Sequence, residues 1–207
     1  RSRMAHLPEW LAIVILGIIE GVTEFLPISS TGHLLIPQNL GWLPRQTDLF
    51  DVVIQSGAVL AVLAVFYKRV AHFAVTLGEA TTRDYLLKLS GAFLITASGG
   101  LLIKKLGIEL PHEIAPVAWA TLIGALVIFA CEWWKKDHRG TAEITWTVVI
   151  VVGLAQIVAA IFPGTSRSGA SILAAMAVGM ARPAATEFSF LLGVPTLMAA
   201  GAYKILS

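Results

Sequence analysis

The chain has 207 residues, of which 57% are hydrophobic and only 14% are charged, and its mean hydropathy is +0.79. Soluble domains carry about 25% charged residues, so this composition excludes an ordinary water-soluble fold and predicts an integral membrane protein. The net charge of +2 does not indicate a nucleic-acid partner, and the single cysteine, Cys131, excludes an intrachain disulfide.

Eight apolar segments follow one another along the chain. Their long runs without alternation favour an all-α, polytopic transmembrane fold over a barrel. Four segments approach the roughly 20 residues that a helical crossing needs. These are 49–67, 86–103, 115–134 and 185–203. No cleavable signal peptide is expected, because the first apolar run leads into Glu20 and Glu24 without a small-residue cleavage site.

The other four segments form two pairs, 9–27 with 32–43 and 144–163 with 168–180. Proline and hydroxyl residues interrupt each pair, and the second member of each pair is too short to cross a membrane well. Each pair is therefore expected to form a re-entrant helical hairpin with a tight polar turn. Non-helical backbone at membrane depth is tolerated only where it is buried in protein or lines a wet cavity, so both turns are candidate sites.

The two hairpins belong to an internal repeat. A shift of 136 residues pairs Gly17 with Gly153, Val22 with Val158, Pro27 with Pro163, Ser30 with Ser166, Gly57 with Gly193 and Tyr67 with Tyr203. Three expected spans separate the hairpins, an odd number, so the repeats should be inverted and should place a site near the midplane. One membrane domain over 1–207 is expected, with repeat cores at 9–68 and 144–204 and further spans and loops at 69–143. The same comparison predicts two more spans after Ser207.

Loop charges predict the orientation. The loops at 69–85 and 135–143 fall on one side of the expected topology. The basic residues in and beside them are Lys68, Arg69, Arg83, Lys88, Lys135, Lys136 and Arg139. The positive-inside rule makes this side cytoplasmic, so the mouth of the first hairpin is expected to face outward.

Glu20 and Glu24 are four residues apart in an apolar helix, so their carboxylates share one face. Charged groups inside a membrane are costly and are usually functional. Such a pair can share a proton, bind a cation or meet an arginine, and a solvated helix end is the alternative. A divalent cation, Mg²⁺ or Ca²⁺, held together with substrate phosphates is one interpretation.

Ser29, Ser30 and Thr31 precede the second helix of the first hairpin, followed by Gly32 and His33. Helix capping explains the hydroxyls by itself. A functional interpretation includes capping, because a helix N-terminus offers free N–H groups to a phosphate. Gly32 would let the backbone approach a ligand, and His33 could act as base, acid or nucleophile, or be a satisfied core residue.

The second polar turn surrounds an arginine. Arg167 is a candidate catalytic residue, and the candidate substrate-binding residues of this turn are Thr165, Ser166 and Ser168. An arginine within the membrane is costly unless it is paired, and its planar fork suits phosphate oxygens. A structural ion pair with one of the glutamates is the alternative. Glu187, at the start of the last span, is expected to complete the cluster or to lie at the interface.

Three motifs, EGVTEFLPISSTGH at 20–33, PGTSRSGAS at 163–171 and EFSFLLGVP at 187–195, carry a family resemblance. The chain resembles the undecaprenyl-diphosphate phosphatase family of the bacitracin-resistance type over essentially its whole length. The family's acidic motif matches Glu20 and Glu24, its serine–histidine element matches residues 29–33, and its arginine element matches Ser166 and Arg167. Family members continue for two more spans.

The resemblance implies a bacterial inner-membrane enzyme that hydrolyses undecaprenyl diphosphate and so recycles the cell-wall lipid carrier. Ser30, His33 or an activated water would attack the terminal phosphorus, with Arg167 neutralising charge. The expected partners are the prenyl diphosphate substrate and membrane lipids, and a homodimer is left open. The alternative from another class is a prenyl-phosphate flippase or small-anion transporter, because inverted repeats are also transporter architecture.

Overall fold

The computed structural model describes residues 7–107, 114–135 and 140–206, without the side chains of Asp48, Asp51, Val52, Ile114, Trp134 and Lys135. Within these ranges the chain is helical, apart from turns and an isolated bridge between Thr141 and Met180. The helices are α1 (Glu9–Thr23), α2 (Ser30–Asn39), α3 (Asp48–Val65), α4 (Tyr67–Val75), α5 (Ala80–Lys105), α6 (Ile114–Lys135), α7 (Trp146–Ile161), α8 (Arg167–Ala177) and α9 (Arg182–Leu206). The predicted all-α class is confirmed.

Several helices are long and apolar enough to cross a membrane. By length and composition α5, α6 and α9 qualify, and α3 with α4 forms a fourth span if the pair, bent by 72°, is counted as one. These helices correspond to the four full-length segments expected from the sequence, which confirms a polytopic membrane protein. The basic residues Lys136 and Arg139, used to predict the orientation, lie outside the described residues.

The loop predicted at 69–85 is wrong in part. It contains α4 and the first turns of α5. Phe73 of α4 is buried, and the guanidinium of Arg69 lies 4.9 Å from the centre of the Phe73 ring and 5.2 Å from that of Tyr85. A short helix with one apolar face therefore forms here, although its charged residues resemble those of a solvated loop.

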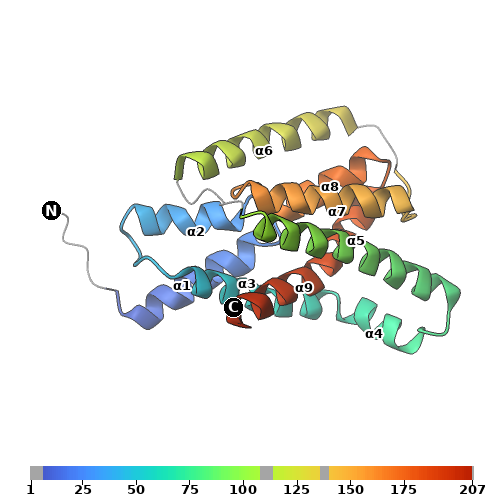
Figure 1. The fold of residues 1–207 in the computed structure, drawn as a ribbon, viewed down its shortest axis with the longest axis horizontal. Coiled ribbons are helices and arrows are strands. Elements are labelled where there is room, and N and C mark those ends of the chain that lie inside the picture. Colours follow the sequence, from blue (N-terminus) through green and yellow to red (C-terminus); the bar gives the residue numbers. More distant parts are fainter. Residues whose placement is uncertain (1–6, 108–113, 136–139, 207) are drawn as a thin grey trace.

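Both predicted helix–turn–helix hairpins are present. In Figure 1, α2 lies beside α1, and α8 lies beside α7. The Ser29 hydroxyl caps α2 by accepting the Gly32 N–H at 3.3 Å, and the Ser166 hydroxyl caps α8 by accepting the Gly169 N–H at 3.1 Å. The sequence repeat pairs Ser30 with Ser166, so the caps are one residue out of that register. Their re-entrant placement in a bilayer stays a prediction.

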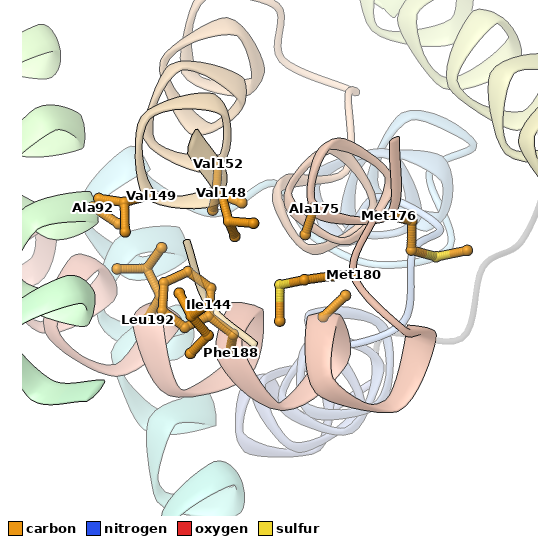
Figure 2. Packing of buried hydrophobic residues seen from close by; sticks show 11 residues of the cluster. Ala92, Ile144, Val148, Val149, Val152, Ala175, Met176, Met180, Phe188 and Leu192 are labelled. Carbon is orange, nitrogen blue, oxygen red and sulfur yellow. The ribbon is translucent and has the colours of Figure 1, made fainter. Parts of the chain in front are cut away.

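The main hydrophobic core lies among α5, α7, α8 and α9. In Figure 2, Val148, Val149 and Val152 of α7 face Phe188 and Leu192 of α9. A smaller cluster on the other hairpin consists of Ala12, Leu16, Leu34 and Leu43. The second hairpin is thus anchored in the core, and the first hairpin meets it through its tip.

α6 lies along one edge of the molecule, beside α8 and α2 (Figure 1). It meets the second tip at Gly164, which has φ +101°. A Cβ atom there would lie 2.4 Å from the Val117 carbonyl oxygen. The Thr121 hydroxyl lies 3.1 Å from the Gly164 carbonyl oxygen and 2.9 Å from the Val117 carbonyl oxygen. Glycine is therefore required here by conformation and by space.

Gly164→Ala is expected to destabilise the protein by about 1–3 kcal/mol, because alanine would be strained at this φ and would overlap α6. Thermal unfolding in detergent measures the loss. Gly100→Ala is the matched control, since a Cβ atom at Gly100 meets nothing within 4 Å. Equal melting temperatures for the two variants would contradict the expected crowding at Gly164.

Candidate active site

The tips of the two hairpins meet inside the protein, although more than a hundred residues separate them in the chain. The Ser168 hydroxyl lies 3.1 Å from the Leu26 carbonyl oxygen and 3.3 Å from that of Glu24. The Ser166 hydroxyl lies 3.4 Å from the same Leu26 oxygen. These contacts join the start of α8 to the backbone that follows α1. The predicted convergence of the two turns is therefore observed.

A polar cavity of about 210 Å³ lies at this junction. Its charged residues are Glu24 and Arg167, and both hairpins supply hydroxyl groups to its wall. The complete lining is Glu24, Ser29, Ser30, Thr31, Gln55, Ala159, Ala160, Pro163, Gly164, Thr165, Ser166, Arg167 and Leu197. A carboxylate, a guanidinium and several hydroxyl groups therefore line one small cavity.

Glu24 holds two different partners at once. One carboxylate oxygen, Oε1, accepts a hydrogen bond from Arg167 Nη2 at 3.0 Å. The other, Oε2, accepts the Ser30 hydroxyl at 2.5 Å. The Glu24 side chain is only 8% exposed and that of Arg167 16%, so this ion pair is shielded from solvent. A carboxylate bound to a serine hydroxyl is the arrangement in which it can act as a general base.

Two nitrogens of the Arg167 guanidinium are hydrogen-bond donors that the described part of the chain leaves unpaired. Its Nε and Nη1 are buried and have no hydrogen-bond partner among the residues that the structure describes. Buried polar groups are nearly always hydrogen-bonded, so unpaired donors beside a polar cavity call for an explanation. An anionic ligand in the cavity would supply the missing acceptors, and phosphate oxygens match the guanidinium geometry.

Ser29 has strained backbone geometry. Its φ is +62°, the left-handed region that residues other than glycine rarely adopt. Its hydroxyl caps α2, and its carbonyl oxygen accepts His33 Nδ1 at 2.8 Å. Strain of this kind concentrates at functional sites, where the surrounding structure maintains it. Here the two hydrogen bonds of Ser29 fix the start of α2 and the His33 ring.

His33 lies in a neighbouring cavity and not in the polar one. This second cavity has a volume of about 990 Å³ and a largely apolar wall, to which α6 contributes Trp119, Ile123 and Val127. The two cavities share Ser29, Gly164, Thr165 and Ser166 as lining residues. A ligand with a polar head and an apolar tail could therefore occupy both cavities and reach Arg167 and His33 together.

Other predicted residues lie outside the polar cavity. Glu20 is fully buried one turn before Glu24 and lines neither cavity. Ser168 is buried and joins the tips. A Cβ atom at Gly32 would meet the Thr121 hydroxyl at 3.3 Å, so Gly32 faces α6 and does not face open space. Glu187 does not complete the cluster, because its carboxylate pairs with Arg69 at 2.9 Å.

Gln55 of α3 lines the polar cavity, and sequence reasoning missed it. An amide in the middle of an otherwise apolar span was the available signal.

The predicted cation site has little support from the side chains near the polar cavity. No group of three His, Cys, Asp or Glu side chains that could hold a metal ion is present in the described ranges. Both oxygens of Glu24 already accept hydrogen bonds, so a cation here would depend on substrate phosphate oxygens for most of its ligands.

Comparisons with known proteins show which proteins this chain resembles. Three similar relatives are each named undecaprenyl-diphosphatase. That of Rhizobium johnstonii is 51% identical over 96% of this chain and 74% of its own length. That of Xylella fastidiosa 9a5c is 50% identical over 94% and 74%. That of Xanthomonas axonopodis pv. citri is 47% identical over 97% and 75%.

A family model described as bacitracin resistance protein BacA matches residues 13–207, nearly the whole chain. The resemblance stated from the three sequence motifs is therefore confirmed. The chain belongs to the bacitracin resistance protein BacA family.

Proposed function

We propose that this protein is a membrane phosphatase that hydrolyses undecaprenyl diphosphate to undecaprenyl phosphate and inorganic phosphate. Relatives about half identical to this chain carry the name undecaprenyl-diphosphatase. The observation that carries the proposal is the placement of Glu24, which binds the Ser30 hydroxyl with one oxygen and Arg167 with the other. One buried cavity thereby holds a general base (Glu24), a nucleophile (Ser30) and a guanidinium that can bind phosphate (Arg167).

The diphosphate would occupy the polar cavity. There, Arg167 Nε and Nη1 would donate to its oxygens while Nη2 stays on Glu24. The N-terminus of α8 adds backbone N–H groups and positive potential beside the same cavity. Phosphoryl transfer is catalysed chiefly by positioning and by charge stabilisation, which is what these groups offer.

The prenyl chain would occupy the large cavity between α6 and the second hairpin. This cavity has a largely apolar wall and shares lining residues such as Ser29 and Thr165 with the polar cavity. An amphipathic substrate therefore has adjacent places for its charged head and its apolar tail.

In the step that we propose, Glu24 accepts the Ser30 proton as Oγ attacks the terminal phosphorus. The bond from that phosphorus to the bridging oxygen breaks, and undecaprenyl phosphate leaves. Water then attacks the phosphoserine, which releases inorganic phosphate and restores the Ser30 hydroxyl. His33, held by the Ser29 carbonyl oxygen, is placed to move a proton where head and tail meet. Attack by His33 or directly by water remains the alternative.

A divalent cation stays a proposal. Glu20 and Glu24 would be its protein ligands, and phosphate oxygens would have to complete its shell, because the described residues offer no third acidic or imidazole ligand there. No step above depends on the cation. The bacterial inner membrane and the outward-facing site also stay proposals, supported by the family resemblance and by the loop charges given earlier, and a homodimer stays open.

Arg167→Ala is expected to lower kcat/KM by about 10²–10³-fold or more, because the charge that stabilises the transition state is lost. Phosphate release from prenyl diphosphate in detergent micelles measures this, and it excludes transport because micelles have no compartments. Arg83→Ala, which alters an exposed arginine of α5, is the control. Near-normal turnover by Arg167→Ala would refute the site.

Glu24→Gln keeps the shape of the side chain but cannot accept a proton. We expect kcat to fall about 10²–10⁴-fold, as for loss of a general base. Glu20→Gln is the companion variant, with activity measured against Mg²⁺ and Ca²⁺ concentration. If neither variant changes the metal response, the proposed cation role of these carboxylates is wrong.

Gly124→Trp should fill the large cavity from α6, because a Cβ atom at Gly124 meets nothing within 4 Å. We expect kcat/KM for undecaprenyl diphosphate to fall at least about tenfold, a loss typical of a blocked apolar subsite, with little change for a short prenyl diphosphate. Gly100→Trp on α5 is the matched control. Equal losses for short and long chains would argue against a tail in this cavity.

A further inference from the structure

α9 passes directly against the Arg167 guanidinium. The residue at the contact is Gly193, which is buried. A Cβ atom at Gly193 would lie 2.6 Å from Arg167 Nη1, 3.1 Å from Nη2 and 3.3 Å from Cζ. Real Cβ atoms essentially never approach a neighbour to 2.6 Å, so alanine at this position would force the guanidinium to move.

Glycine is unfavourable in the interior of a helix, so its presence in α9 needs a reason. Gly193 does not have a positive φ, unlike Gly164 and Gly179. The backbone conformation therefore does not require glycine at 193. The reason that the structure offers is close approach, because only a bare backbone leaves room for Arg167.

The contact determines how Arg167 is presented. Nη2 is tied to Glu24 on one side, and the α9 backbone lies against the same end of the side chain. Nε and Nη1 remain without hydrogen-bond partners among the described residues. Arginine is a flexible side chain, and two fixed contacts restrict its guanidinium to one plane and one depth in the cavity.

The internal repeat supplies a comparison within the same chain. The equivalent of Gly193 in the first repeat is Gly57 of α3, and the equivalent of Arg167 is Thr31. A Cβ atom at Gly57 would meet nothing within 4 Å. The crowding is therefore specific to the repeat that carries the arginine, and it is no general property of this helix position.

We propose that Gly193 is a positioning residue for the phosphatase reaction. The absence of a side chain at 193 lets the Arg167 guanidinium lie against α9, with Nε and Nη1 left to bind the diphosphate. This inference rests on the proposed function, in which Arg167 binds the substrate phosphates.

The test is Gly193→Ala, assayed by phosphate release in micelles together with thermal unfolding. We expect kcat/KM to fall about 10²-fold or more, as when a transition-state donor is misplaced. Gly201→Ala is the matched steric control on the same helix, because a Cβ atom there would meet Ser56 Oγ at 2.2 Å, outside the residues that line the polar cavity. Gly57→Ala is the uncrowded control. Activity within about threefold of the Gly201→Ala value would overturn the proposal.

A double-mutant cycle with Arg167→Lys asks whether Gly193 acts through the arginine. Lysine carries no planar fork, so we expect Gly193→Ala to cost little further activity in the Arg167→Lys background. An equal loss in both backgrounds would overturn the proposal. If Gly193→Ala does not accumulate, recovery of folded protein in the double variant supports it, and failure to recover overturns it. Loss of activity in Arg167→Ala with full activity in Gly193→Ala would reject this inference alone, whereas an active Arg167→Ala would reject the proposed function.

Discussion

The ion pair between Glu24 and Arg167 is the contact on which the rest of the site depends. It joins the end of one hairpin's first helix to the start of the other hairpin's second helix, within a shielded interior. A charge left alone in such a place is costly, so each tip stabilises the other only while they are in contact. Two other features maintain that contact. Ser166 and Ser168 contact the Leu26 carbonyl oxygen, and the bare backbone at Gly193 leaves room for the Arg167 guanidinium.

The two halves of the proposed internal repeat carry complementary charged residues. In the 136-residue register Glu20 corresponds to Gln156, and Glu24 corresponds to Ala160. Arg167 corresponds to Thr31. The first repeat thus supplies negative charge and the second supplies the cation, so neither hairpin could form the chamber with a copy of itself. Gln156 is still buried, with its Oε1 3.4 Å from the Thr196 hydroxyl, which leaves a neutral polar group where the other repeat has an acid.

Sequence patterns predicted the long spans and the two polar hairpins, because hydropathy and proline placement depend on local composition. The proposed inverted repeat predicted that the hairpins converge. They did not predict features that depend on how helices cross. Glu187 was expected near the site, but the 72° bend between α3 and α4 allows Arg69 to pair with it. Gln55 could not be assigned to the polar cavity because its helix was read only as a span. The sequence places His33 next to the hydroxyls, whereas the cavity that it lines depends on the position of α6.

The four residues shared by the two cavities have a consequence for molecules that compete with the substrate. A small anion such as pyrophosphate can accept hydrogen bonds from Arg167 but leaves the larger, apolar cavity empty. A hydrocarbon alone fills that compartment but brings no acceptor to the guanidinium. Useful antagonists should therefore be amphiphiles whose junction between head and hydrocarbon sits beside Ser29 and Thr165, and the rigidity of that junction should matter as much as the charge of the head.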